Sequence, residues 1–151
     1  MIKAPSEVTA KVYLSQAYRT DLHISAMLMR VSQLRELATK ASATLSDMPR
    51  PDSPNLQPME SIVLKLVDTE ERINASIDTL VNFKEQLANQ IYAMENEDYR
   101  ALLELRYICF KTWVEIARMM KYDIRWVYRL HDKALMQFAK DYGCVIPKKA
   151  V

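Results

Sequence analysis

The chain has 151 residues, half of them hydrophobic, with one glycine and a net charge of +2. This length suits one ordinary domain or a small domain with a helical appendage, and the hydrophobic content argues against disorder. Phosphate-binding loops of nucleotide enzymes need several glycines, so a P-loop and a dinucleotide fingerprint are both excluded. A chain this poor in glycine is typical of long helices with few loops, and we predict an all-α fold.

The residues that usually carry metal or redox chemistry are isolated. Cys109, Cys144, His23 and His131 form no pair at metal-ligand spacing, so we expect no metal and no cofactor. Two unpaired cysteines fit a reducing cytosol. The chain has no apolar run long enough for a signal peptide or a membrane span, and we expect a cytoplasmic protein without membrane association. No spacing of acidic residues and histidines justifies a catalytic site, so we expect no enzyme.

The charge is unevenly distributed along the chain. Residues 1–95 carry 10 Lys/Arg and 12 Asp/Glu, a net charge of −2, whereas residues 96–151 carry 11 and 7, a net charge of +4. The C-terminal third is therefore the candidate surface for a polyanion. The excess by itself is also compatible with solvated helical faces.

The clearest break in the chain is rich in proline. Four of the six prolines lie within residues 46–58. Proline removes a hydrogen-bond donor and restricts the residue before it, so these residues are predicted to form a loop. Pro58 fits the first turn of the following helix, where a missing N–H is tolerated.

Apolar residues on both sides of this loop follow the helical period. Before the loop the stripe consists of Leu14, Ala17, Ile24, Met27, Leu28, Val31, Leu34, Ala38, Ala41 and Leu45. After the loop a heptad seam with three polar interruptions consists of Met59, Ile62, Leu66, Thr69, Ile73, Ser76, Leu80, Phe83, Leu87, Gln90 and Met94.

We predict that residues 10–95 form a long antiparallel helical hairpin of coiled-coil type, preceded by a tail at residues 1–9. Val63, Ile77 and Ile91 widen the stripe beside the seam. A hairpin this narrow leaves apolar surface exposed, so it is expected to pair with a second chain or to pack on the C-terminal domain. We expect a homodimer or a higher homo-oligomer.

Residues 96–142 are predicted to form three helices, followed by a tail at residues 143–151. Asn96 is a suitable cap for the first helix, which ends in a short break at residues 110–111. Thr112 and Glu115 have the spacing of a capping box, which opens a second helix at residues 113–120. A tight turn at residues 121–122 follows.

Asp123 is predicted to cap a third helix at residues 124–142. Its apolar positions, Val127, Leu130, Ala134 and Phe138, fall on one side, and Arg125, Arg129, Asp132 and Met136 fall on the other. A short helix, a tight turn and a divided third helix are typical of a DNA-binding helix-turn-helix, in which Ala117 gives room at the helix crossing. Amphipathicity alone would equally fit a plain bundle helix.

The candidate DNA-binding residues follow from this interpretation. On the third helix they are the exposed or flanking residues Arg125, Trp126, Tyr128, Arg129, Asp132 and Lys133. Arginine pairs with guanine, and tyrosine or arginine can also take a phosphate. The candidates for contacts to the DNA backbone are Arg106, Lys111, Arg118 and Lys121.

Residues 103–107, 112–117 and 123–138 resemble the fourth conserved region of bacterial sigma factors. That region joins an "LRY"-like helix to an "E-I-A" helix and a recognition helix. The core positions of the recognition helix are matched by Val127, Leu130, Ala134, Leu135 and Phe138. The resemblance implies a sequence-specific transcriptional regulator that binds double-stranded DNA and contacts RNA polymerase.

The whole chain resembles a family of small sigma-like proteins of phages and prophages of Gram-positive bacteria, whose relatives activate late genes. Residues 37–49 and 124–127 carry this wider resemblance. It implies a transcription regulator of a bacterial host cell.

The sequence departs from sigma factors at informative positions. Lys121 stands where they usually have glycine, so this residue is expected to adopt a positive φ, or the turn differs. Base-contacting positions are occupied by Ile124, Arg125, Trp126 and Arg129, so an ordinary −35 element is not the expected target. The promoter-melting region has no counterpart, and the chain is not a complete initiation factor.

Two other functions remain open from the sequence. One is the DNA-recognising small subunit of a phage packaging complex, which a native mass of eight or more chains would favour. The other is a partner-binding helical module without DNA binding, which a loss of all DNA affinity at low salt would favour.

Overall fold

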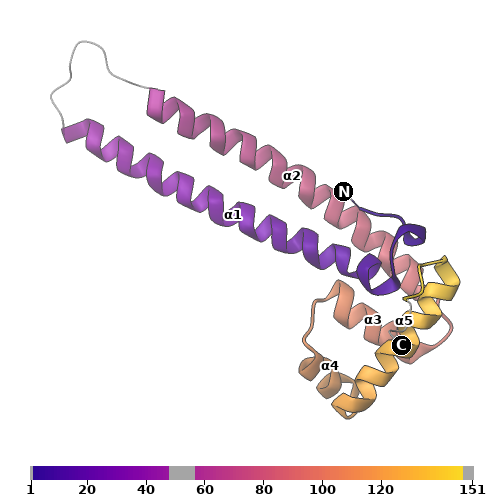
Figure 1. The fold of residues 1–151 in the computed structure, drawn as a ribbon. Coiled ribbons are helices and arrows are strands. Elements are labelled where there is room, and N and C mark those ends of the chain that lie inside the picture. Colours follow the sequence, from indigo (N-terminus) through magenta and orange to yellow (C-terminus); the bar gives the residue numbers. More distant parts are fainter. Residues whose placement is uncertain (1, 48–56, 148–151) are drawn as a thin grey trace. The chain divides into compact units, whose positions relative to one another are not determined.

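In a computed structural model, which describes residues 2–47 and 57–147, the chain is helical apart from short connections (Figure 1). In chain order the elements are a 3-10 turn η1 (Pro5–Glu7), α1 (Ala10–Asp47), α2 (Gln57–Tyr92), α3 (Glu97–Leu103), a π-helical stretch η2 (Glu104–Ile108), α4 (Trp113–Met120) and α5 (Ile124–Tyr142). No strand occurs in the described ranges, where Thr9 and Val145 form one isolated parallel bridge. The all-α prediction is confirmed.

The chain divides into two compact units. Residues 1–20 and 80–151 form one, here called the core unit, and residues 21–79 form the other, here called the helix-pair unit. Both long helices contribute to both units. The division therefore has different boundaries from the ranges 10–95 and 96–142 suggested by the sequence.

Tyr13 connects three helices of the core unit. Its ring meets the ring of Phe83 on α2 edge-on at 5.5 Å and stacks on that of Phe138 on α5 at 5.9 Å. Its hydroxyl donates to Gln90 Oε1 at 2.9 Å and accepts from Gln86 Nε2 at 3.0 Å. Because every polar atom of this buried ring has a partner, the start of α1 is fixed against the end of α2 and against α5.

The N-terminal and C-terminal segments of the described chain are joined by a backbone hydrogen bond. The amide of Val145 donates to the carbonyl of Val8 at 2.9 Å, directly after Gly143 ends α5 with a φ of 69°. The left-handed conformation of Gly143 is easily adopted only by glycine, and it reverses the chain toward the N-terminal segment. Val145, in the segment that we expected to be a C-terminal tail, is thus paired with the N-terminal segment.

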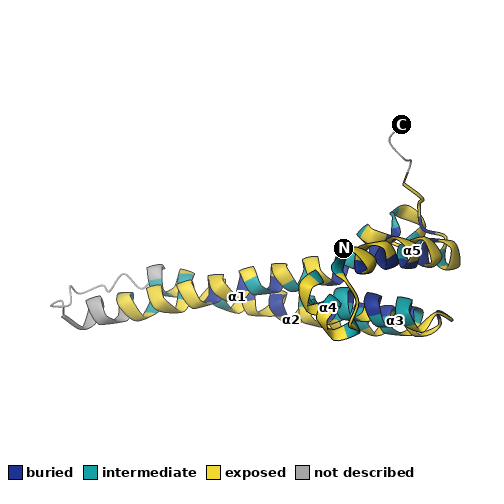
Figure 2. Ribbon diagram, turned by 90° about the horizontal axis from the view of Figure 1, so that it is seen from below, coloured by how far each residue is buried: buried dark blue, intermediate teal, exposed yellow. Residues whose placement is uncertain are grey.

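The helix-pair unit has a thin interior. Its buried residues are Ile24, Met27 and Val31 on α1 and Thr69 and Ile73 on α2. Arg35 Nη2 and Glu70 Oε1 form an ion pair at 2.9 Å between the two helices. Figure 2 shows the long stretches of exposed surface along both helices.

The predicted seam of α2 is the shielded face, since every seam residue is buried or half-buried. The stripe of α1 is likewise shielded at its described positions, with one exception. The prediction for Leu28 is wrong, because its side chain is 52% exposed. Met27 and Val31 already occupy the inward positions, and the next residue along a helix points about 100° away from them.

The loop predicted at residues 46–58 extends further at both ends than the structure allows, because the two helices continue into it. α1 continues to Asp47 and α2 begins at Gln57, so Pro58 lies in the first turn of α2, as expected. The rest of this predicted loop, and the side chain of Leu45, lie outside the described residues.

Candidate functional site

α3 begins as predicted from its cap. The Asn96 side chain accepts hydrogen bonds from the amides of Asp98, at 2.9 Å, and Tyr99, at 3.2 Å. The helix then widens into η2, whose end is followed by Phe110 in the left-handed conformation, with a φ of 57°. This residue breaks the helix where the sequence predicted a break.

α4 begins with the predicted capping box. The amide of Glu115 donates to Thr112 Oγ1 at 3.2 Å, and the amide of Thr112 donates to Glu115 Oε2 at 3.0 Å. This backbone hydrogen bond lowers the pKa of the Glu115 carboxyl. Both groups stabilise the first turn of a helix that has only eight residues.

Three residues separate α4 from α5. Lys121 adopts the left-handed conformation, with φ 58° and ψ 40°, and the amide of Tyr122 donates to the carbonyl of Ala117 at 3.1 Å. The expected positive φ at Lys121 is confirmed. Tyr122 also donates its hydroxyl hydrogen to Asp98 Oδ2 at 2.9 Å, which connects the turn to α3 and raises the pKa of the Tyr122 hydroxyl.

Asp123 precedes α5 at the cap position, but its side chain accepts no cap hydrogen bond. Asp123 is therefore the N-cap residue, as predicted, but without the side-chain hydrogen bond that usually stabilises a cap. The first turn of α5 is oriented by the turn and by side-chain packing instead.

The inner face of α5 packs on α3 and α4. Leu102, Ile116, Val127 and Leu130 form a buried cluster in which none is more than 4% exposed. Ala117 packs against this cluster from α4. Val127, Leu130, Ala134 and Phe138 are all buried, so the predicted inner face of α5 is confirmed.

The outer face of α5 carries all six candidates that the sequence placed on this helix. Arg125, Trp126, Tyr128, Arg129, Asp132 and Lys133 are exposed. Arg125 and Arg129 form no ion pair with any residue in the described parts of the chain. Lys133 lies over the ring of Trp126, with Nζ 5.2 Å from its centroid. Two guanidinium groups one turn apart are thus free to bind a ligand.

The four backbone-contact candidates fall into two groups. Arg118 and Lys121 are exposed at the end of α4, whereas Arg106 and Lys111 are half-buried. Arg106 Nη1 donates to the carbonyl of Lys111 at 3.0 Å, and its guanidinium lies 4.5 Å from the centre of the Trp113 ring. Arg106 therefore also holds the loop that precedes α4.

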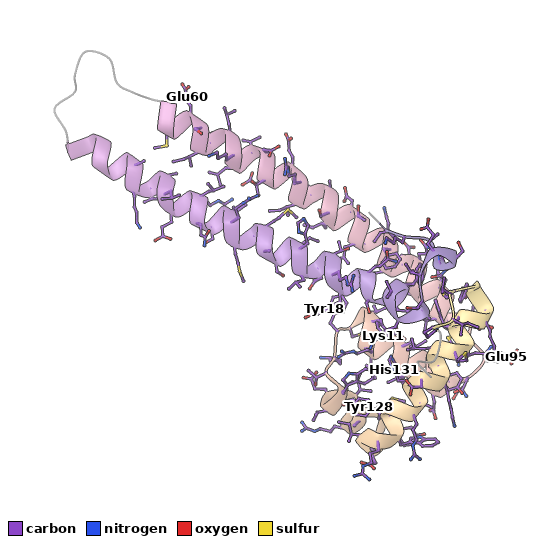
Figure 3. The ribbon with its side chains drawn as sticks, in the orientation of Figure 1. Lys11, Tyr18, Glu60, Glu95, Tyr128 and His131 are labelled. Atoms are coloured by element: carbon purple, nitrogen blue, oxygen red, sulfur yellow. The ribbon has the colours of Figure 1, made fainter. Side chains whose placement is uncertain are left out.

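The sequence did not predict an aromatic cluster that α5 forms with the residues before it. The ring of Trp113 meets that of Tyr128 at 5.3 Å and that of His131 at 4.6 Å. His131 Nε2 and the Tyr107 hydroxyl share a hydrogen bond of 2.6 Å. Figure 3 shows Tyr128 and His131 on α5. The only signal in the sequence was a histidine next to the apolar positions of α5.

The charge state of this buried pair is set by its surroundings. Burial lowers the pKa of His131 to about 4, and the positive charges of Lys11 and Arg106 act in the same direction, against the carboxylate of Asp132. Burial also raises the pKa of Tyr107. The pair is therefore uncharged at neutral pH and joins η2 to α5 without a buried charge.

Among the residues described, no group of three or more His, Cys, Asp and Glu side chains is arranged to hold a metal ion. Within the same residues, no helix combines the length and apolar character of a membrane span. An apolar groove of about 690 Å³ runs between Lys11 and Val145 and along α5 past Lys133 and Met136.

Comparison with known proteins places the chain in a family. Neither the curated proteins nor the solved structures yield a significant match. A family model matches residues 55–139, a range that includes α2, α3, α4 and most of α5. The match covers more than half of the chain, so the chain belongs to the family described as a protein of unknown function (DUF1492).

Proposed function

We propose that α4 and α5 form a helix-turn-helix that binds double-stranded DNA, with α5 as the recognition helix. The observation that carries this proposal is the outer face of α5. Its arginines, Arg125 and Arg129, are exposed and unpaired within the described structure, while the opposite face is anchored by fully buried side chains. A recognition helix needs this combination of a rigid support and free donors.

The dimensions of the motif are compatible with the major groove. The groove is about 12 Å wide and admits an α-helix. Arg125 and Arg129 are separated by one helical turn, so both can reach base edges on the same side of α5. Each guanidinium can donate two hydrogen bonds to a guanine, and the Asp132 carboxylate can accept one from a cytosine amino group.

The remaining basic residues suit contacts to phosphates. Arg118 and Lys121 are exposed close to the turn, and Lys111 is half-buried before α4. Tyr128 is held by Trp113 with its side chain still 46% exposed. Such contacts set the position of α5 on the duplex and make the affinity dependent on salt.

The resemblance to the fourth region of sigma factors supports a role in transcription. We propose a sequence-specific transcriptional regulator, encoded by a phage or prophage, that contacts RNA polymerase or occupies an operator in the cytoplasm of the host cell. A homodimer would read two half-sites separated by whole turns of duplex.

A gel-shift and footprint experiment on DNA flanking its own gene tests the proposal. Arg125→Ala and Arg129→Ala should each weaken specific binding by roughly 1–3 kcal/mol, because each removes a contact to a base. The matched control is Arg19→Ala, an exposed arginine on α1 that should leave binding unchanged. Equal losses on specific and random DNA would instead mark a phosphate contact. Absence of any shift at low salt would contradict DNA binding and favour a partner-binding module.

A further inference from the structure

Both helices of the helix-pair unit carry apolar side chains on their outer faces. On α1 these are Leu22, Met29 and Leu37, here called the outer stripe of α1. On α2 they are Val63 and Ile77, which lie beside the buried seam, and Val67, which lies further round the helix, here called the outer stripe of α2. The spacings keep each set on one side of its helix, and the six side chains are between 40% and 68% exposed.

The six residues of the two outer stripes outnumber the buried residues described in the helix-pair unit. Five residues are buried among the described side chains of residues 21–79. Stable helical assemblies bury a stripe on each helix against another layer, and contiguous exposed apolar surface marks an interaction site. The two outer stripes therefore have the properties of an unfilled interface.

We propose that a second copy of this chain covers these stripes, with the outer stripe of α1 in one copy packed on the outer stripe of α2 in the other. A twofold axis parallel to the helices generates two such contacts at once, because α1 and α2 of each copy both take part. The inference goes beyond DNA binding and holds whether or not α5 binds DNA.

The register of the two helices supports this pairing. Arg35 and Glu70 form an ion pair and so lie at the same height. Because α1 and α2 run antiparallel, residue numbers rise along one helix as they fall along the other. Residue 37 of α1 therefore lies level with about residue 68 of α2, and residue 29 with about residue 76. A parallel twofold axis preserves height, so Leu37 of the second copy meets Val67, and Met29 of the second copy meets Ile77.

The charges beside the stripes are complementary in the same register. Arg30 on α1 and Glu71 and Asp78 on α2 are exposed and form no ion pair with a described residue of their own copy. By the same count, Arg30 lies level with about residue 75, between the two acidic residues. Opposite charges beside an apolar contact favour one partner and fix its register, and here both sides belong to the same sequence.

Sedimentation equilibrium of the full-length chain tests whether a second copy binds. The expected mass is twice 17.6 kDa. Val67→Lys places a charge in both contacts and should raise the dissociation constant roughly a hundredfold. Ser61→Lys, at an exposed position of α2 away from the outer stripe and from the charges at Glu71 and Asp78, is the matched control and should leave the mass unchanged. Helix content by circular dichroism should be the same in all three proteins.

A charge exchange tests the pairing itself. Arg30→Glu alone and Glu71→Arg/Asp78→Arg alone should each weaken self-association about tenfold, because each brings like charges together. An equimolar mixture of the two variants should associate as well as the unchanged chain, since both contacts become complementary again in the mixed pair. No residue in this test belongs to the proposed DNA-binding face.

Three results would overturn the proposal. The first is a monomeric mass at concentrations of about 100 µM, well above the micromolar range of specific association. The second is an equal effect of Val67→Lys and Ser61→Lys on self-association, and the third is no mixed association of the charge variants. Loss of DNA binding with intact self-association would contradict the proposed function alone. A monomer that still protects a single DNA site would contradict this inference alone.

Discussion

The core unit and the helix-pair unit are built from the same two long helices but differ in where their apolar side chains lie. In the core unit, Leu14 and Leu87 on these helices are fully buried. In the helix-pair unit, Leu22, Met29 and Leu64 are more than half exposed. The core unit also contains α3, α4 and α5, and α5 packs on both long helices, where Phe138 stacks on Tyr13 of α1 and Tyr142 donates to the carbonyl of Gln90 of α2. The same amphipathic pattern therefore gives a closed interior only where further elements pack on it.

The largest expected effect comes from the closed interior. Phe138 is fully buried and its ring contacts those of Tyr13 at 5.9 Å and Tyr142 at 4.6 Å. Phe138→Ala leaves a cavity and should lower the free energy of unfolding by about 3–5 kcal/mol. Urea unfolding followed by tryptophan fluorescence measures this loss, since Trp113 and Trp126 both lie in the core unit.

Leu64→Ala on the helix-pair unit is the control for this experiment. Its side chain is 69% exposed, so the free energy of unfolding should change by less than about 0.5 kcal/mol. Equal losses in the two variants would show that the two units do not differ in packing as described.

Acid should lower the stability of the core unit through the protonation of His131. Its pKa is about 4 when folded and about 6.5 when unfolded, so below pH 6.5 the unfolded state binds more protons. This group should therefore remove up to about 3 kcal/mol of stability between pH 6.5 and 4, and none above that range. Urea unfolding at several pH values measures the slope.

His131→Gln separates this contribution from that of the carboxylates. The amide keeps a hydrogen-bond partner for Tyr107 and does not titrate, so stability should depend less on pH between 6.5 and 4. The same slope in both proteins would show that His131 protonates equally in the folded and unfolded states.

A smaller and local effect is expected in the helix-pair unit. Ile73 is 6% exposed, and Ile73→Ala should destabilise the unit by about 2 kcal/mol. Hydrogen exchange should become faster in residues 21–79 and stay unchanged in α5. Leu28→Ala, at a 52% exposed position on α1, should leave exchange unaltered. Faster exchange throughout the core unit would mean that the two units unfold together.

The smallest effect concerns the turn before α5. Lys121 has a φ of 58°, which costs a non-glycine residue about 1 kcal/mol. Lys121→Gly should therefore raise the melting temperature slightly, whereas Lys140→Gly, inside α5, should lower it by a similar amount. A lower melting temperature for Lys121→Gly would mean that contacts of the lysine side chain outweigh the relief of backbone strain.

Local signals in the sequence were sufficient for the elements around the candidate site. The bounds of α4 and α5 were predicted from a capping box, a short turn and an apolar period, all of which involve residues within a few positions of one another. Asn96 and the seam of α2 were predicted for the same reason. Asp123 caps α5 without a side-chain hydrogen bond, because residue type favours a cap without ensuring that bond.

Contacts between distant residues were not predictable in this way. The sequence contains Tyr107 and His131, but no periodicity relates two residues 24 positions apart. Nor does it relate Val8 to Val145, or Tyr13 to Phe138. These pairs form only when helices have packed, because shape and burial select them.

The sequence by itself determined which segments are helical and which side of α5 is apolar, since both depend on backbone propensity and on the 3.6-residue period. The tertiary structure decided which apolar stripes become an interior. It buried Phe83 and Leu87 of α2 inside the core unit and left Val63 and Val67, on the same helix, exposed. The physical reason is that an apolar side chain is buried only when other side chains pack against it, and whether they do depends on how the helices assemble.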